Sequence, residues 1–395
     1  MEKSLASCDR VLCRYAQGYS DRQLLCNFVR QAFAQFGLTS ETLRGKRVVL
    51  KPNLVMKAEP DRAATVHPSL VDAVLCVLDE SACADVVLAE SCGGPFHAAA
   101  LAGVYRVTGM EDALRGHRAR LNDDFTADTL SFPQGKATKQ FRIIHAVAQA
   151  DIVINLSKLK SHALTTMSGA VKNFFGTIPG LEKFEMHARF PEYDDFSQML
   201  VDLCLLHHTR AQVLNLLDAV VCMEGNGPTA GKPHAVGCLF ASDNAFALDM
   251  VAAELLGFSG RVLMLEKAKE RGLCPPQICL LGDDPVARAP QHFLAPDTKS
   301  DHNPLIRLPK LFGKDVFAVF RPRPVIEKTC VGCGRCVSAC PAHTITLRQV
   351  RRRDGTFARR AKIHSNRCIR CFCCQELCPH RCVRIHKNLL LRFLG

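Results

Sequence analysis

The sequence predicts an α/β protein, with an open, mostly parallel, doubly wound sheet over residues 1–300 and a small cysteine-rich α+β domain after it. Short apolar runs alternate with segments of helical periodicity, and the runs are apolar on both faces, as strands covered by helices on both sides must be. A cysteine spacing that occurs twice after residue 329 marks the second domain. With 395 residues, 48% of them hydrophobic, the chain can bury a large core.

The apolar runs predict strands at residues 48–50, 85–89, 151–156, 211–217 and 236–241. Helical spacing predicts helices at residues 21–36, 68–78, 197–208, 245–256 and 261–271. Polar residues follow each strand, and ligands of open α/β sheets bind beyond the carboxyl ends of the strands. We therefore expect a binding site where these strands end.

Prolines are frequent and periodicity is weak between residues 284 and 324, which predicts a connector at residues 301–325. The cysteine-rich domain is then expected at residues 326–387. The final tail, residues 388–395, contains a short apolar stretch that we expect to dock on a neighbouring segment. This stretch is far too short to span a membrane.

Eight cysteines follow the spacing C-x2-C-x2-C-x3-C-P twice, at residues 330–341 and 368–379. The pattern resembles the two-cluster bacterial ferredoxins, in which the fourth cysteine of each run binds the other cluster. It implies one [4Fe–4S] cluster held by Cys330, Cys333, Cys336 and Cys378. It implies a second held by Cys368, Cys371, Cys374 and Cys340.

Two alternatives bear on this assignment. Structural zinc also uses C-x2-C pairs, but a four-coordinate ion has no use for eight cysteines in a duplicated pattern. Cys373 and Cys382 fall outside the count, and a register through Cys373 competes with the one through Cys374. We prefer Cys374 because it completes both the C-x2-C and the C-x3-C-P spacing.

The other eleven cysteines are scattered singly from Cys8 to Cys279. Without a pairing pattern they are interpreted as reduced, small core residues. No apolar run reaches 18 residues and no leader is recognisable, so a soluble protein of the cytoplasm, in an anaerobe, is expected.

The formal net charge of +13 is concentrated near the C-terminus. Residues 321–395 hold 17 Lys and Arg against 3 Asp and Glu, a net of +14. A basic redox domain steers acidic partners, which favours a ferredoxin or flavodoxin as the redox partner. Nucleic acid is the rival explanation for the arginines at 351–353 and 359–360. We favour a solvated hairpin, with strands at 344–350 and 357–363 around the turn Asp354-Gly355.

Four motifs occur in order in the α/β region. They are Lys51-Pro52-Asn53, Lys-x-Lys-Ser-His ending at His162, Thr-Thr-x-Ser-Gly-Ala-x-Lys-Asn ending at Asn173, and Glu-Gly-x-Gly-Pro starting at Glu224. Together they resemble the family called domain of unknown function 362, whose members often carry a ferredoxin module. The resemblance implies an α/β domain linked to iron–sulfur chemistry and names no reaction.

The lysines, amides and hydroxyls of these motifs form a cationic set that suits carboxylate or phosphate oxygens. The anion-binding candidates are Lys51, Asn53, Lys158, Ser168 and Asn173, in one set with Lys160 and Lys172. Thr165, Thr166 and Ser168 precede a helical pattern at 170–175, so hydroxyls and free N–H groups would point at an anion. Capping of that helix alone is the alternative.

The candidate catalytic residues are His162, Lys160, Lys172 and Glu224, and His187 is a further candidate proton carrier or metal ligand. Glu90, Asp218 and Glu224 with a histidine would suit a divalent metal, although no spacing demands one. Cys92, at a strand end, is a candidate nucleophile. Neither G-x-G-x-x-G nor a P-loop occurs, so nothing here indicates a dinucleotide or Walker-type site.

Three functions fit these observations. In the first, an iron–sulfur oxidoreductase passes electrons through two clusters to or from an anionic substrate or cofactor held by the lysines. In the second, the chain is an electron-transfer subunit whose α/β domain only docks a partner. In the third, it is a non-redox ligase or transferase with structural clusters. The polar residues at the strand ends favour the first.

Overall fold

A computed structural model describes residues 8–298, 321–351 and 356–386. Within these residues the main sheet has nine strands in the order β11-β1-β10-β9-β7-β2-β3-β4, with β8 paired to β7 off that path. The strands are β1 (Asp9–Tyr15), β2 (Arg47–Pro52), β3 (Asp85–Leu88), β4 (Arg120–Leu121), β7 (Ile152–His162), β8 (Thr166–Ser168), β9 (Gln212–Glu224), β10 (Lys232–Ser242) and β11 (Ile278–Gly282).

The sheet is mostly parallel, as the sequence predicts. The central run β9-β7-β2-β3-β4 is parallel throughout, and β1 pairs β11 in parallel. β10 is the exception, because it lies antiparallel to both β9 and β1. Strands β1 and β11 were not expected from the sequence.

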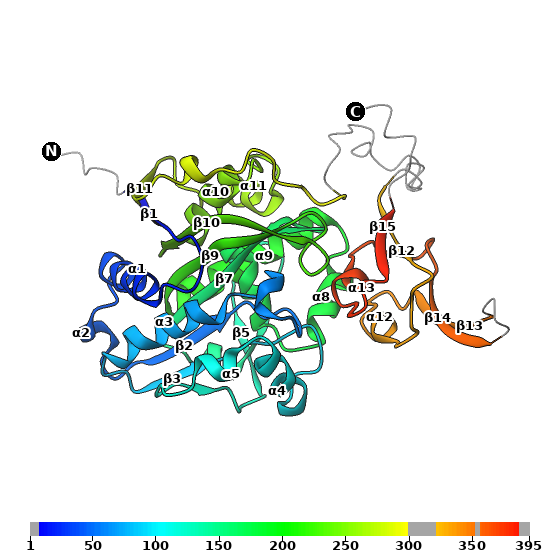
Figure 1. Ribbon diagram of the computed structural model, residues 1–395, viewed down its shortest axis with the longest axis horizontal. Coiled ribbons are helices and arrows are strands. Elements are labelled where there is room, and N and C mark those ends of the chain that lie inside the picture. The colour runs from blue at the N-terminus through cyan, green and yellow to red at the C-terminus, as the bar shows by residue number, and fades with distance from the viewer. Residues whose placement is uncertain (1–7, 299–320, 352–355, 387–395) are drawn as a thin grey trace.

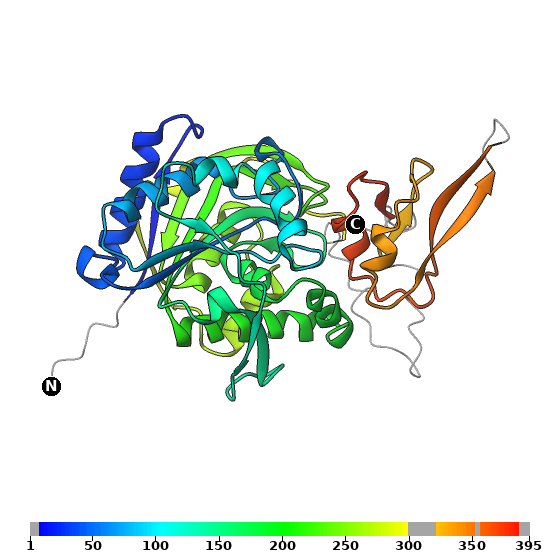
Figure 2. The same ribbon diagram turned by 90° about the horizontal axis from the view of Figure 1, so that it is seen from below.

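Helices cover both faces of the sheet (Figures 1 and 2). One face carries α1 (Arg22–Gln35), α2 (Ser40–Leu43), α3 (Pro68–Asp79), α4 (Ala98–Val107) and α5 (Met110–Ala113). The other carries α6 (His145–Ala148), α7 (Ala170–Asn173), α8 (Glu182–Arg189), α9 (Tyr193–Arg210), α10 (Ala245–Leu255) and α11 (Leu263–Glu270), with the hairpin β5 (Ala127–Ser131) and β6 (Gln140–Ile144). Short 3-10 turns are η1 (Pro60–Arg62), η2 (Phe174–Thr177) and η3 (Pro285–Arg288).

Local sequence explains where the helices begin. Asp21 caps α1 by accepting a hydrogen bond from the Leu24 N–H, and Asn244 caps α10 in the same way. Pro68 stands at the first turn of α3, where a missing N–H costs nothing. The predicted helices are therefore found within a few residues of their expected ends.

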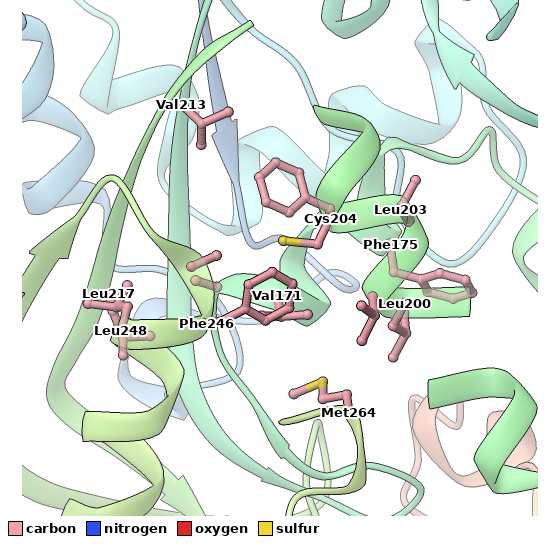
Figure 3. Packing of buried hydrophobic residues seen from close by; sticks show 14 of the residues in the cluster. Val171, Phe175, Leu200, Leu203, Cys204, Val213, Leu217, Phe246, Leu248 and Met264 are labelled. Atoms are coloured by element: carbon pink, nitrogen blue, oxygen red, sulfur yellow. The ribbon is translucent and has the colours of Figure 1, made fainter. Parts of the chain in front are cut away.

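Alternation along the strands divides the core between the two faces. Val49 of β2 packs into one hydrophobic cluster, whereas Val48 and Leu50 pack into the other. Figure 3 shows part of the first cluster, where Cys204 of α9 lies among apolar side chains. The scattered cysteines fit the predicted core role only in part, because Cys8 and Cys279 are exposed.

The C-terminal domain is small and contains two short antiparallel sheets. Its elements are β12 (Arg323–Ile326), α12 (Arg335–Ser338), β13 (Ile345–Arg351), β14 (Phe357–Ile363), α13 (Cys373–Glu376) and β15 (Val383–His386). β12 pairs β15, and β13 pairs β14 as the predicted hairpin. The turn Asp354-Gly355, most of the predicted connector and the C-terminal tail lie outside the described residues.

The two domains meet through α13. In both views α13 lies against the α/β domain, while the β13–β14 hairpin points away from it (Figures 1 and 2). Across the part of the chain that is described, every helix is too short or too polar to cross a membrane.

Candidate functional site

The polar residues after the third and fourth predicted strands lie within the strands themselves. β7 continues to His162 and β9 to Glu224, well past their predicted ends at residues 156 and 217. The two strands pair in register there, which places Asn155 opposite Asn215 and Lys158 opposite Asp218. The prediction that Lys158, Lys160 and Asp218 follow the strand ends is therefore wrong, because β7 and β9 continue through them.

Lys158 is not available to an anionic ligand. Its Nζ lies 2.9 Å from Asp218 Oδ2 and donates to the Tyr19 hydroxyl at 2.8 Å. The side chains of Lys158 and Asp218 are at most 1% exposed. This candidate is thus half of a buried ion pair on the α1 side of the sheet.

Lys51 is likewise neutralised. Its Nζ donates to Glu90 Oε2 at 2.8 Å, to the Pro52 carbonyl at 2.8 Å and to Asn173 Oδ1 at 3.2 Å. Gly176 leaves room for this pair, because a Cβ there would lie 2.7 Å from Lys51 Nζ and would also meet Glu90. Lys51 therefore holds Glu90 and Asn173 in position through these hydrogen bonds.

A chain of amides connects the strands to the site. Asn155 Nδ2 donates to Asn215 Oδ1 at 2.8 Å, and Asn173 Nδ2 donates to Asn155 Oδ1 at 2.7 Å. Asn53 Nδ2 donates to Asn173 Oδ1 at 2.9 Å, and its own oxygen accepts from Lys160 Nζ at 2.6 Å. These bonds fix the orientation of the amides and of the Lys160 side chain.

A pocket of about 600 Å³, part of it open to solvent, lies between this network and the C-terminal domain. From the α/β domain its lining includes Asn53, Glu90, Ser91, Lys160, Ser168, Lys172, Asn173, Lys183 and His187. From the C-terminal domain it includes Cys373, Glu376 and Leu377. We call it the interdomain pocket.

Three lysines of the interdomain pocket have no carboxylate partner at ion-pair distance among the described residues. Lys160 Nζ donates to Asn53 and to the Ala64 carbonyl, and Lys183 Nζ donates to the Ser91 hydroxyl and the Ile178 carbonyl. Lys172 lies over the Phe175 ring, with Nζ 5.7 Å from its centroid.

Burial of these ammonium groups lowers their pKa values. It lowers the pKa of Lys183 to about 8. It also lowers the pKa of Lys172, and burial together with repulsion from Lys172 lowers that of Lys160. An anion in the pocket would reverse these shifts, because a nearby negative charge favours the charged lysine.

His162 lies beside Glu376 and is not among the residues that line the interdomain pocket. Its Nδ1 accepts hydrogen bonds from the N–H groups of Leu164 and Thr165, so a neutral ring carries its proton on Nε2. Nε2 lies 3.9 Å from Glu376 Oε2. His187 instead stacks on Phe196, and burial lowers its pKa to about 3, which keeps it neutral.

The N-terminus of α7 does not face an anion site. The N–H groups of Ala170 and Val171 donate to the carboxylate of Asp249, at 2.7 and 3.0 Å. The Thr165 and Thr166 hydroxyls donate to backbone carbonyls, and Ser168 alone of the three predicted hydroxyl residues lines the interdomain pocket. The expectation that this helix start binds a ligand is therefore wrong, because α10 supplies the anion.

Glu224 lies outside the interdomain pocket. Its carboxylate is 3.1 Å from His234 Nδ1 and accepts from the Leu294 N–H. Glu90, Asp218 and Glu224 therefore have separate partners and form no common metal site. Cys92 donates to the Leu54 carbonyl, and burial raises its pKa, which disfavours a role as nucleophile.

One group of metal-ligating side chains does come within 4.8 Å among the described residues, namely Asp72, Cys76 and His117. It lies at α3, remote from the interdomain pocket. Arg22 already pairs with Asp72 at 2.7 Å, and Asp79 with His117 at 2.6 Å.

The C-terminal domain docks on the glycine-rich loop that follows β9. Thr229 Oγ1 donates to the Glu376 carbonyl at 2.7 Å, and Gln375 Nε2 donates to the Asn226 carbonyl at 2.9 Å. Arg381 donates to the Thr229 carbonyl at 3.1 Å. The Glu-Gly-x-Gly-Pro motif thus serves domain docking.

The cysteines of the duplicated spacing gather in two sets. Cys330, Cys333, Cys336 and Cys378 line one pocket of about 350 Å³, together with Cys382. Burial raises the pKa of Cys336 to about 11, and the charges of the other three cysteines add to the shift. Burial likewise raises the pKa of Cys374, which has Cys371, Cys368 and Cys340 among its neighbours.

This arrangement fits cluster binding. Four converging thiols would be held as thiolates by the metal, which removes the mutual repulsion. Two of the sulfurs already accept backbone hydrogen bonds, Cys378 from the Cys382 N–H at 3.2 Å and Cys340 from the Thr344 N–H at 3.3 Å. Such bonds tune cluster potentials.

Sequence reasoning missed part of the site. Lys183 lies outside the four motifs and was not chosen as an anion ligand, since nothing local distinguished it. Glu90 was named only as a metal candidate, whereas it is the partner of Lys51. Glu376 and Cys373 belong to the other domain. No signal in the sequence places them beside Lys172.

Comparison with known proteins identifies both parts of the chain. Residues 48–254 match the family named domain of unknown function (DUF362), and residues 329–382 match the 4Fe-4S dicluster domain. The thylakoid-associated protein sll1697 of Synechocystis sp. is 32% identical over 271 residues, which are 66% of this chain and 78% of that protein.

Two solved structures show a distant likeness. The lactate racemase apoprotein from Thermoanaerobacterium thermosaccharolyticum matches with a TM-score of 0.39 and 13% identity, over 63% of this chain and 57% of that chain. A Thermotoga maritima protein matches with 0.32 and 11%, over 63% and 58%. The chain thus spans less than two thirds of either, and neither likeness carries an inference about activity. On its sequence, this chain belongs to the domain of unknown function 362 family and carries a 4Fe–4S dicluster domain at its C-terminal end.

Proposed function

We propose that this protein is an iron–sulfur oxidoreductase that exchanges electrons with a small anionic substrate in the interdomain pocket. The observation that carries the proposal is that α13 forms one wall of this lysine-lined pocket. Cys373, which faces the pocket, is adjacent to Cys374, a ligand in the proposed second cluster. Substrate and cluster would therefore lie on two sides of one short helix.

In this proposal Cys330, Cys333, Cys336 and Cys378 hold the first cluster, and Cys368, Cys371, Cys374 and Cys340 hold the second. Each cluster would supply one-electron transfer at a potential in the range of about −700 to +450 mV. The loop of the first cluster is the exposed one, because Cys333 is exposed and Val331 is 56% exposed. This supports electron entry or exit there, through an acidic carrier that the basic domain attracts.

The residues of the interdomain pocket would bind and orient the substrate. Lys160, Lys172 and Lys183 supply positive charge, and the amides of Asn53 and Asn173 hold Lys160 in place. A two-electron reduction of the substrate also takes up two protons. We propose that Glu376 passes protons to the pocket, and the approach of His162 Nε2 to within 3.9 Å of its carboxylate supports this role.

The proposal is tested by electron paramagnetic resonance on anaerobic, dithionite-reduced protein, with and without added carboxylates and phosphate. We expect about eight iron per chain, as two [4Fe–4S] clusters require, and reduced-cluster signals that change when a ligand binds. Lys172→Met should abolish the ligand-induced change, whereas Lys136→Met, at an exposed site, should leave it intact. Signals indifferent to every ligand would favour a dedicated electron carrier, and fewer than about five iron would reject the eight-ligand assignment.

A further inference from the structure

We infer that the ligand of the interdomain pocket carries two separate anionic groups, as a short dicarboxylate does. This inference rests on the proposed function and narrows its substrate class. The charges of the pocket wall and their positions support it.

The wall has an excess of two positive charges. The lining residues with formal charge are Lys160, Lys172, Lys183, Glu90 and Glu376. Lys51 neutralises Glu90 at 2.8 Å, so the three lysines face only Glu376, and three minus one leaves +2. Buried charge is costly unless it is paired, and a dianionic ligand would pair it.

The lysines of the pocket fall into two groups that have different neighbours. Lys160 and Lys172 are close enough to repel each other, and both are attracted by Glu376 of the C-terminal domain. Lys183 belongs to α8 and lies against Ser91 and the Ile178 carbonyl, beside Glu90. A ligand with one anionic group beside each group of lysines would pair with both groups, whereas a compact anion would pair with one.

The rest of the wall suits a short carbon chain. Apolar side chains of Val55, Phe175, Phe184 and Leu377 complete the lining. Methylene groups between two carboxylates would contact such surfaces favourably.

The rival explanation is that the lysines balance the negative charge of the second cluster. It accounts for Lys172, which lies beside Cys373. It does not account for Lys183, whose hydrogen-bond partners Ser91, Cys92 and Ile178 belong to the α/β domain. Lys183 is therefore the residue on which the two explanations differ.

The test is calorimetric titration of the cluster-loaded protein under anaerobic conditions. The probes are malonate, succinate and glutarate as dicarboxylates, butyrate as a monocarboxylate, and inorganic phosphate as a compact anion. We expect one dicarboxylate to bind at least about tenfold more tightly than butyrate and phosphate. Loss of the Lys183 charge should weaken its binding about tenfold to a hundredfold in Lys183→Met, while Lys183→Arg and Lys136→Met retain most of the affinity.

The outcomes separate this inference from the proposed function. The inference would be overturned if butyrate or phosphate bound as tightly as the best dicarboxylate. It would also be overturned if Lys183→Met, with normal iron content and circular dichroism, bound the dicarboxylate with unchanged affinity. Dicarboxylate binding that leaves the reduced-cluster signals unmoved would support the two-anion site and reject the redox function. If Lys183→Met bound the dicarboxylate normally but had shifted cluster potentials in the absence of ligand, the lysines would serve to balance the charge of the cluster.

Discussion

Replacement of Lys51 by Met should destabilise the α/β domain by about 3 kcal/mol, because it leaves Glu90 buried without its cation. Both side chains are at most 3% exposed, and removal of one partner of a buried ion pair costs about 3–5 kcal/mol. Glu90 would keep only the Leu54 N–H at 3.3 Å and the more distant charge of Lys183. That residual support places the expected cost at the lower end of the range.

The cost should depend on pH. Burial already raises the pKa of Glu90, and loss of Lys51 would raise it further. A carboxyl group with a raised folded-state pKa binds its proton more tightly when folded, so it stabilises the protein at low pH and that contribution is lost as pH rises. The Lys51→Met penalty should therefore be smallest near pH 5 and grow toward pH 8.

The assay is anaerobic urea unfolding followed by far-ultraviolet circular dichroism, with Lys136→Met as the exposed-lysine control. The double variant Lys51→Met with Glu90→Gln should recover about 1 kcal/mol or more, since the two residues act as a unit. A Lys51→Met cost below about 1 kcal/mol, or costs that simply add in the double variant, would refute the reasoning that this pair is a buried support of the pocket.

Three other predictions concern single groups. Burial raises the pKa of Asp249 from 3.8 to about 7, so the stability of the wild-type protein should fall as pH rises through this interval. In the same unfolding assay, the free energy of unfolding of Asp249→Asn should gain about 3 kcal/mol relative to that of the wild type between pH 5 and pH 8. Cys374→Ser should lose about four of eight iron atoms while Cys373→Ser retains all of them, and the reverse pattern in an iron count would select the alternative register. Because burial lowers the pKa of Lys183 to about 8, dicarboxylate binding at pH 8 should be accompanied by proton uptake. Calorimetry in buffers of different ionisation enthalpy would detect this uptake, and proton release would contradict the prediction.

The sequence was sufficient where local patterns decide the structure. Apolar runs and helical spacing predicted the central strands and helices, and the hairpin β13–β14 was expected within one residue of its observed ends. The antiparallel position of β10 was not predictable, because strand direction depends on which neighbour a strand pairs with. β1 was missed because pairing with β10 and β11 stabilises it from both sides, at residues far along the chain.

The sequence predicted the residue types of the candidate site but not how these residues are arranged. The lysines of the motifs were singled out as an anion-binding set, yet their partners lie across the sheet or in another element. Lys158 meets Asp218 through strand register, and Lys51 meets Glu90 through a parallel neighbour. Of the seven lysine, amide and hydroxyl candidates, five line the interdomain pocket and two are consumed by ion pairs.

The same geometry bears on how the C-terminal domain works. A domain that carried electrons on a flexible tether would need no specific contact with the α/β domain. Here Thr229, Gln375 and Arg381 make hydrogen bonds across the interface. Leu377 also packs closely against Gly93, where a Cβ would lie 2.6 Å from Leu377 Cδ2. The wall of the interdomain pocket exists only while these contacts hold. If the interdomain pocket binds a ligand as proposed, ligand binding and the cluster environment would be coupled through α13. A ligand that binds better to the reduced protein would then raise the cluster potential by the corresponding free energy.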